Sequence, residues 1–306
     1  MDIPNIADIV IIGGGVMGAS AAYHLAKRGM KNIVLLEKED LFGTGATGRC
    51  AGGVRYQFST EINIRLSLES LPMIERFEQE LEQAVGYRKC GYLLIATKEK
   101  DAAAFRRNVE LQNSLGVHTH FLEGDEVRTR LPLMKFEDAL AGTFNQEDGI
   151  VDPNSVVAGY IRAAQAIGVR ANTRTEVTGI QVSGDQVQAV ETTRGVIWTR
   201  MILNAAGPWA GQVGQMAGVQ IPIVPIRRQM FTTNPLKEIP EDFPFVIDFA
   251  RSLYFHREGE GLLIGMSNQA EKPGFDQTVD ENFEFMNSRE CQQPARRSTR
   301  RAEAVS

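Results

Sequence analysis

The sequence predicts an α/β fold, and three observations support this prediction. An apolar run at residues 7–12 ends in Gly13-Gly14-Gly15 and is followed by a helical pattern over residues 16–28. A second apolar run, residues 32–37, ends in a carboxylate. Later apolar segments are short and separated by turns, as in antiparallel sheets. We therefore expect one β-α-β unit with parallel strands, and antiparallel strands further along the chain.

Composition and charge set broad limits. The 306 residues, 43% of them hydrophobic, suffice for one large or two modest domains. A net charge of −5 gives no global field that would recruit nucleic acid or an anionic membrane. Three cysteines without a CxxC pair favour a reducing compartment over a disulfide framework or a zinc site. No signal-peptide pattern or membrane-length apolar run is visible, so we expect a cytoplasmic protein.

Period and turn signals place the remaining elements. Helices are expected over residues 62–82, with a break at Pro72, and over 99–115 and 154–166. Strands are expected over 90–97, 140–144, 200–206, 227–233, 253–256 and 261–266. Residues 169–198 predict a small antiparallel meander with a hairpin turn at Gly184-Asp185. The arginine-rich residues 286–306 predict a disordered tail, either solvated or used for docking.

The first glycine cluster has the spacing of a dinucleotide-binding turn. Gly13, Gly15 and Gly18 lie between a strand and a helix, which is the context that this fingerprint requires. They allow a tight turn, close approach of a pyrophosphate and packing of the helix on the strand. The helix N-terminus at Val16 and Met17 then offers N–H groups and a partial positive charge to the pyrophosphate. The alternative is a glycine-rich turn that binds no ligand.

The type of dinucleotide follows from more distant residues. Glu37, nineteen residues after Gly18, ends the second strand, where a carboxylate accepts from ribose hydroxyls. It would repel a 2′-phosphate, even with Lys38 beside it, so NADP is disfavoured. The small-residue segments 43–53 and 204–210 favour FAD over NAD, because FAD is usually buried along its length.

Four motifs in this order resemble the D-amino-acid-oxidase-type FAD oxidoreductases: residues 11–18, 36–38, 45–55 and 204–210. The chain is most similar to the sarcosine oxidase beta subunits within this family, with dimethylglycine, glycine and proline oxidases or dehydrogenases nearby. Residues 148–153 and 225–229 add to the match. The resemblance implies a Rossmann-type FAD-binding domain of the glutathione-reductase type (1–88 and 152–222). It is interleaved with a mostly antiparallel substrate domain (89–151 and 223–285).

The resemblance also implies FAD contacts, which we carry over residue by residue. Gly13, Gly15 and Gly18 would hold the pyrophosphate, Glu37 the ribose, and Lys38 would lie on the adenine side. A further group would line the phosphate-ribityl side of the flavin: Gly45, Ala46, Thr47, Gly48 and Arg49. The remaining contacts are Ala51, Gly52 and Gly53 near the ring, the Val177 backbone at adenine, and Ala206 and Gly207 over the pyrophosphate.

The implied reaction oxidises the C–N bond of a small, N-alkylated amino acid such as sarcosine. A hydride passes from the carbon beside nitrogen to flavin N5, and the iminium product then hydrolyses. Expected partners are the amino-acid substrate and either other subunits of a hetero-oligomeric oxidase or an electron-accepting flavoprotein, with no nucleic acid and no membrane span.

Three residues are candidates for the substrate side. Arg55 matches the position where the family sets an arginine for the substrate carboxylate; a structural ion pair is the alternative. Tyr254 and His256 are two apart on an expected strand and share a face. In the family this strand passes over the substrate face of the flavin. His256 could affect amine protonation, or be a surface or core-edge histidine. Cys50 is a small loop residue or, alternatively, a covalent flavin link.

Two expectations limit this assignment. No metal is expected, because His118 and His120 share a strand face without a third ligand nearby. Family members continue beyond the similarity, which fades near Phe285, so we expect a chain without the family's C-terminal part. A non-catalytic binding or assembly protein that retains the fold is therefore the alternative function. A pyridine-nucleotide dehydrogenase is disfavoured by the downstream glycine segment.

Overall fold

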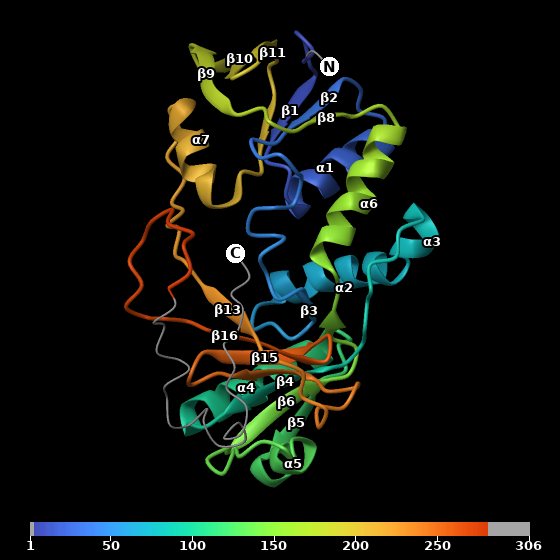
Figure 1. Cartoon of the computed structure of the whole chain (residues 1–306), viewed down its shortest axis with the longest axis vertical. Helices are drawn as coiled ribbons and strands as arrows, with labels where there is room; N and C mark the ends of the chain where they lie inside the picture. The colour runs from blue at the N-terminus through green and yellow to red at the C-terminus, as the bar shows by residue number, and fades with distance from the viewer. Residues whose placement is uncertain (1–2, 281–306) are drawn as a thin grey trace.

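The computed structural model describes residues 3–280, which form an elongated molecule with a different sheet at each end (Figure 1). A four-stranded parallel sheet lies at the end with the N-terminus, and a seven-stranded, mostly antiparallel sheet lies at the other. The α/β prediction is confirmed. The predicted domain boundaries stay a prediction, and the predicted tail lies outside the described residues.

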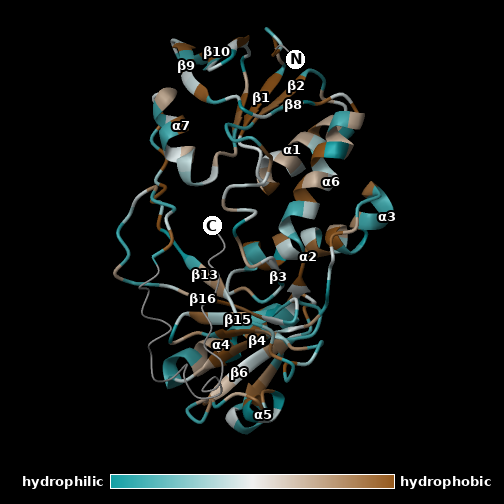
Figure 2. Ribbon diagram, viewed as in Figure 1, coloured by the Kyte–Doolittle hydropathy of each residue, from teal (hydrophilic) through white to brown (hydrophobic). Residues whose placement is uncertain are grey.

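The parallel sheet is built around the first β-α-β unit. Its order is β12-β1-β2-β8, with β1 at Ile9–Ile12, β2 at Ile33–Leu36, β8 at Arg170–Asn172 and β12 at Ile202–Asn204. All residues of β1 and β2 are buried, as their unbroken apolar sequences predict, and Figure 2 shows both strands as strongly hydrophobic.

Helices α1 (Val16–Lys27) and α6 (Pro153–Ala166) pack together on one face of this sheet (Figure 1). Helix α6 begins at Asp152, whose side chain accepts from the backbone N–H of Asn154 and Ser155, with Pro153 in the first helical turn.

The opposite face is covered by a three-stranded antiparallel sheet and α7 (Ala210–Met216), which follows the 3₁₀ turn at Gly207–Trp209. The sheet contains β9 (Val177–Ser183), β10 (Gln186–Thr192) and β11 (Gly195–Trp198). The hairpin at residues 184–185 is confirmed. The meander does not start at residue 169, however, because β8 follows α6 as the end of a crossover and pairs in parallel with β2.

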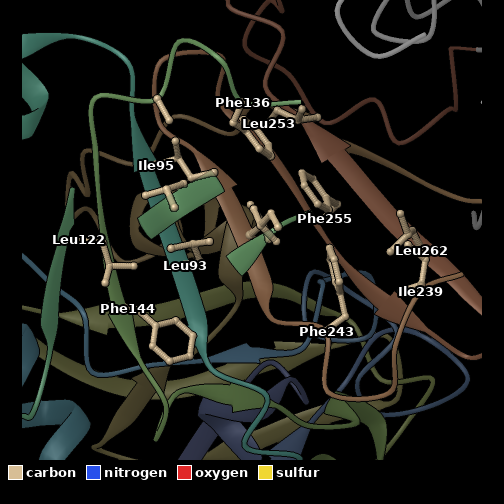
Figure 3. Close-up of a cluster of buried hydrophobic side chains, with 14 of the residues drawn as sticks. Leu93, Ile95, Leu122, Phe136, Phe144, Ile239, Phe243, Leu253, Phe255 and Leu262 are labelled. Atoms are coloured by element: carbon tan, nitrogen blue, oxygen red, sulfur yellow. The ribbon is translucent and has the colours of Figure 1, made fainter. Parts of the chain in front are cut away.

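The large sheet has the order β13-β16-β15-β14-β4-β6-β5, and only β4 and β14 run parallel. Its strands are β4 (Tyr92–Ala96), β5 (His120–Glu123), β6 (Ala141–Asn145), β13 (Gln229–Thr232), β14 (Phe245–Asp248), β15 (Leu253–Glu258) and β16 (Gly261–Met266). Figure 3 shows the core on one face, where Leu93, Ile95 and Phe255 meet side chains from the covering loops. The alternate residues point to the other face, which carries the site.

The remaining described elements are two short paired strands and four helices, and the helix that follows β4 packs against β4, β5 and β6 of the large sheet. They are β3 (Gly53–Val54), β7 (Gly149–Ile150), α2 (Glu61–Glu75), α3 (Phe77–Leu81), α4 (Glu99–Ser114) and α5 (Gly124–Arg130). The predicted break at Pro72 is wrong: α2 continues to Glu75, because the buried Ile64 and Leu71 hold it in place, and it ends at Arg76. No described helix is long and apolar enough to cross a membrane.

Candidate cofactor and substrate site

The first glycine turn connects β1 to α1 at the carboxyl end of the parallel sheet. Gly13 has φ +109°, and a β-carbon there would overlap the carbonyl group of Ala205. A β-carbon on Gly18 would overlap the carbonyl oxygen of Gly13. Both positions therefore require glycine, and the turn brings segment 204–207 against the start of α1, as the predicted site requires.

Glu37 lies beside this turn and fastens it. Its Oε2 accepts from the N–H of Gly14 at 2.8 Å, and its Oε1 accepts from the N–H of Glu39 at 3.0 Å. Gly14 was not among the predicted site residues, since nothing local links it to Glu37. The Lys38 ammonium lies 3.8 Å from the ring centroid of Trp209, in the 3₁₀ turn after β12.

The glycine-rich loop, residues 43–53, returns to the N-terminus of α1. Thr47 Oγ1 accepts from the N–H of Val16 at 3.1 Å, and the N–H of Gly48 donates to Gly43 O at 2.7 Å. Arg49 donates to Thr44 O and to Gln277. The predicted residues of the first turn and of this loop thus lie together. Met17, Gly45, Ala46 and Thr47 are exposed or half-buried at the same place.

These segments fit a dinucleotide. The first turn of α1 begins at Gly15 and carries no acidic side chain, so its N–H groups and dipole favour a pyrophosphate. Space is open beside Gly45 and beside Gly207, where a β-carbon would meet nothing within 4 Å. Val177 is buried in the core with Val10 and Val34, so a contact through its backbone, as predicted, is compatible with its position.

The loop's last glycine, Gly53, packs against the seven-stranded sheet. A β-carbon on Gly53 would overlap the hydroxyl of Tyr92 and approach the Phe245 ring to 3.2 Å. Strand β3 at Gly53–Val54 also pairs with β7. The loop therefore spans from the nucleotide turn to the substrate-side sheet. A cavity of about 370 Å³ lies beside it, lined by residues 48–52 and 230–232 and including the exposed Cys50.

Beneath this loop is a layer that we call the aromatic face: Tyr92, Phe245, Tyr254 and His256. The Tyr92 and Phe245 rings stack at 4.2 Å, and Phe245 stacks on His256 at 4.8 Å and on Tyr254 at 6.0 Å. Tyr254 and His256 do share a face of β15. Tyr254 is half-buried, and burial raises the pKa of its phenol.

His256 is 1% exposed, so it is neither the surface nor the core-edge histidine of the alternative interpretation. Its Nδ1 lies 2.8 Å from Arg257 O, while Nε2 has no hydrogen-bond partner among the described residues. Burial lowers the pKa of the imidazole below its usual value. The ring is therefore neutral at neutral pH, which a proton acceptor requires.

Arg55 lies at the edge of the aromatic face. Its guanidinium carbon is 4.7 Å from the Phe58 ring centroid and 5.9 Å from that of Tyr92. Within residues 3–280 no carboxylate lies at ion-pair distance from Arg55, in contrast to the structural ion pair that was its alternative. A half-buried guanidinium without an internal counter-ion is suited to an anionic ligand.

Asp148, which the sequence presents only as the first residue of a motif, is fully buried and close enough to Arg55 for their charges to interact. It accepts from the N–H of Tyr56 at 2.6 Å and from Gln57 Nε2 at 2.8 Å. Burial raises the pKa of this carboxyl to about 7, against the lowering effect of these hydrogen bonds and of Arg55. Only the tertiary structure brings residues 55–57 and 148 together.

Comparison with known proteins agrees with this geometry. Residues 8–297 match the family described as FAD dependent oxidoreductase. The chain belongs to this family. As an FAD-dependent oxidoreductase it resembles mitochondrial dimethylglycine dehydrogenase of Rattus norvegicus, 34% identical over 270 residues, with 87% of this chain and 31% of the relative covered. Mitochondrial sarcosine dehydrogenase of Homo sapiens is 33% identical, with 92% and 31% covered.

A solved structure extends the likeness to the fold. L-proline dehydrogenase from P. horikoshii superposes with a TM-score of 0.83 at 31% identity, over 93% of this chain and 75% of that chain. The FAD oxidoreductase fold and FAD as the family's cofactor are therefore confirmed. The chain spans about a third of the length of the curated relatives.

Proposed function

We propose that this chain forms the FAD-binding and substrate-binding part of an oxidoreductase that oxidises the C–N bond of a small, N-alkylated amino acid such as sarcosine. The observation that carries the proposal is the environment of Arg55. Its half-buried guanidinium has no counter-ion among the described residues and lies where the glycine-rich loop meets the aromatic face.

The geometry around Arg55 suits an amino-acid carboxylate. A guanidinium binds a carboxylate through two parallel hydrogen bonds, which orients a small ligand as well as holding it. The aromatic rings of Phe58 and Tyr92 support the guanidinium, so little side-chain freedom is lost on binding. Such orientation is the protein's main contribution when a cofactor carries out the redox chemistry.

The remaining steps divide between the cofactor and the chain. FAD, when bound, supplies the hydride acceptor for the carbon beside the substrate nitrogen. The chain holds the carboxylate at Arg55, and Tyr254 offers a protonated phenol on the same face. The neutral, solvent-shielded His256 adds no positive charge there, which favours an unprotonated, oxidisable amine. The iminium product then hydrolyses in water.

The relatives support the substrate class. Dimethylglycine, sarcosine and L-proline, named in the matched proteins, are all amino acids with an alkylated nitrogen. We propose sarcosine as the substrate among these. The proposal also includes a cytoplasmic location and either further subunits or a flavoprotein that accepts the electrons.

The test is flavin reduction in the purified chain. The protein is loaded with FAD, its visible absorption is recorded, and sarcosine is added without oxygen. We expect the flavin bands to bleach in the wild type and in Glu147→Gln, an exposed control next to Asp148, but slowly in Arg55→Met. Bands that do not bleach with sarcosine, dimethylglycine or proline would contradict the substrate class. Failure to retain added FAD would support the alternative, a non-catalytic assembly protein.

A further inference from the structure

The segment that carries Arg55 is held on both sides by one turn of the chain. Before Arg55, strand β3 pairs with β7, Gly53 opposite Ile150 and Val54 opposite Gly149. After Arg55, the N–H of Tyr56 donates to Asp148 Oδ1 at 2.6 Å. The backbone of Arg55 is thus bounded by contacts to residues 148–150.

A buried network extends this attachment to the large sheet. Asp148 Oδ2 accepts from Gln57 Nε2 at 2.8 Å, and the same amide donates to Tyr92 O in β4 at 3.0 Å. Gln57 Oε1 accepts from Thr143 Oγ1 in β6 at 2.7 Å. Asp148, Gln57 and Thr143 are each at most 4% exposed. The network therefore fixes segment 55–57 relative to the strands that form the aromatic face.

The hydrogen-bond partners of Asp148 also explain why the Arg55 guanidinium has no ion pair with this carboxylate. Both carboxylate oxygens bind neutral donors, the Tyr56 amide and the Gln57 side chain. Asp148 is near enough to Arg55 for their charges to interact but forms no ion pair with it. A direct pair would compete with a ligand carboxylate for the same guanidinium.

We infer that Asp148 is a positioning residue for carboxylate binding: through Tyr56 and Gln57 it fixes the backbone of Arg55 and leaves the guanidinium free for the ligand. This inference rests on the proposed function, since it assumes that Arg55 binds a carboxylate. Replacing Asp148 by asparagine keeps the shape but leaves one acceptor oxygen for two donors, the Tyr56 N–H and Gln57 Nε2, so the network must rearrange.

The experiment separates this role from general stability. The FAD-loaded full chain is titrated with methoxyacetate, a carboxylate with no amine to oxidise, and with the uncharged methoxyacetamide, while flavin absorption is followed. We expect Asp148→Asn to weaken methoxyacetate binding about tenfold and to leave methoxyacetamide binding unchanged. Glu147→Gln should bind both ligands like the wild type. In an Arg55→Met background, Asp148→Asn is expected to have no further effect, because it acts through Arg55.

Other results would overturn the inference. One is that Asp148→Asn binds methoxyacetate as the wild type does; another is that it binds methoxyacetate and methoxyacetamide equally more weakly. A third is that the losses of methoxyacetate affinity add in the Arg55→Met, Asp148→Asn double variant. If Asp148→Asn does not fold, Gln57→Met removes the same link to the sheet and is subject to the same outcomes. A wild type that binds FAD but not methoxyacetate would instead contradict the proposed function. In that case the positioning role is tested separately by comparing backbone amide hydrogen exchange of residues 54–58 in the wild type and in Asp148→Ala. Equal protection of these amides in the two proteins would overturn the inference.

Discussion

The glycine turn of the parallel sheet and the aromatic face of the seven-stranded sheet form their sites by opposite means. At the turn, the groups offered to a ligand are backbone N–H groups, and the side chains matter mainly by their absence at Gly13 and Gly18. At the aromatic face, the groups are side chains, Arg55, Tyr254 and His256, from segments about 200 residues apart.

The two sites should therefore respond differently to mutation. At the glycine turn, a side-chain atom added to Gly13 or Gly18 would disturb the backbone that is offered to the ligand. The same backbone holds α1 against β1, so cofactor binding and folding stability should fall together. A site made of side chains on a completed sheet can lose a ligand contact while the fold persists.

Gly18→Ala should have the largest effect, because its β-carbon would overlap Gly13 O and force α1 away from β1. We expect a loss of about 5 kcal/mol in unfolding free energy, together with loss of FAD binding. Urea unfolding and FAD titration measure the two. Gly274→Ala, where a β-carbon meets nothing within 4 Å, is the control and should change stability by less than about 0.5 kcal/mol. A stable Gly18→Ala protein that binds FAD would contradict the expected loss of binding and stability together at this turn.

The next largest effect concerns pH and the buried Asp148. Its pKa of about 7 in the fold lies above its ordinary 3.8, so the folded state binds the proton more tightly than the unfolded state. The resulting stabilisation is complete below about pH 4 and is lost as pH rises to about 7, a change of about 4 kcal/mol.

Asp148→Asn cannot titrate and should flatten the pH dependence of unfolding over this range, whereas Glu147→Gln should not. Urea unfolding at several pH values measures it. Identical pH profiles for wild type and Asp148→Asn would show that Asp148 stays ionised throughout.

Arg55→Lys tests the opposite behaviour, function lost with the fold retained. Lysine keeps the charge but cannot form two parallel bonds to a carboxylate, so we expect methoxyacetate to bind about 10- to 100-fold more weakly. Unfolding free energy should change by less than about 1 kcal/mol, since Arg55 forms no ion pair among the described residues. A stability loss as large as that of Gly18→Ala would remove the distinction between the two regions.

The smallest expected effect is that of Lys38→Met at the nucleotide end. The Lys38 ammonium over Trp209 contributes about 0.5 kcal/mol at a partly exposed site, and its ion pair with Glu39 adds little. Lys31→Met, another exposed lysine of the same region, is the matched control. Equal unfolding free energies for the two variants would show that the ring contact contributes nothing.

The predictability of the fold follows the same division. The nucleotide end is encoded locally: apolar runs, glycine spacing and Glu37 lie within 30 residues, and the structure has the expected elements there. Strand β8 was placed in the wrong sheet because its pairing with β2 is non-local. The sequence pattern does not predict strand β14, since an apolar run of only three residues, Phe245 to Ile247, after several prolines carries little periodicity.

The candidate site shows this limit most clearly. Tyr254 and His256 follow from period-two alternation, but the burial of His256 depends on the glycine-rich loop above it. Arg55 follows from its place in a motif, whereas its lack of a counter-ion depends on where the Asp148 oxygens are directed. The contacts that direct the Asp148 oxygens join segments about 90 residues apart, so no local sequence pattern can predict them.

The interleaved strand order affects how the chain is made. On the ribosome, β1 and β2 emerge first, yet their neighbours β12 and β8 lie beyond the strands β4 and β6 of the other sheet. The nascent chain must therefore keep the apolar edges of β1 and β2 from pairing wrongly while more than a hundred further residues are synthesised. Neither half can be completed alone, so we expect slow, cooperative folding that benefits from chaperones.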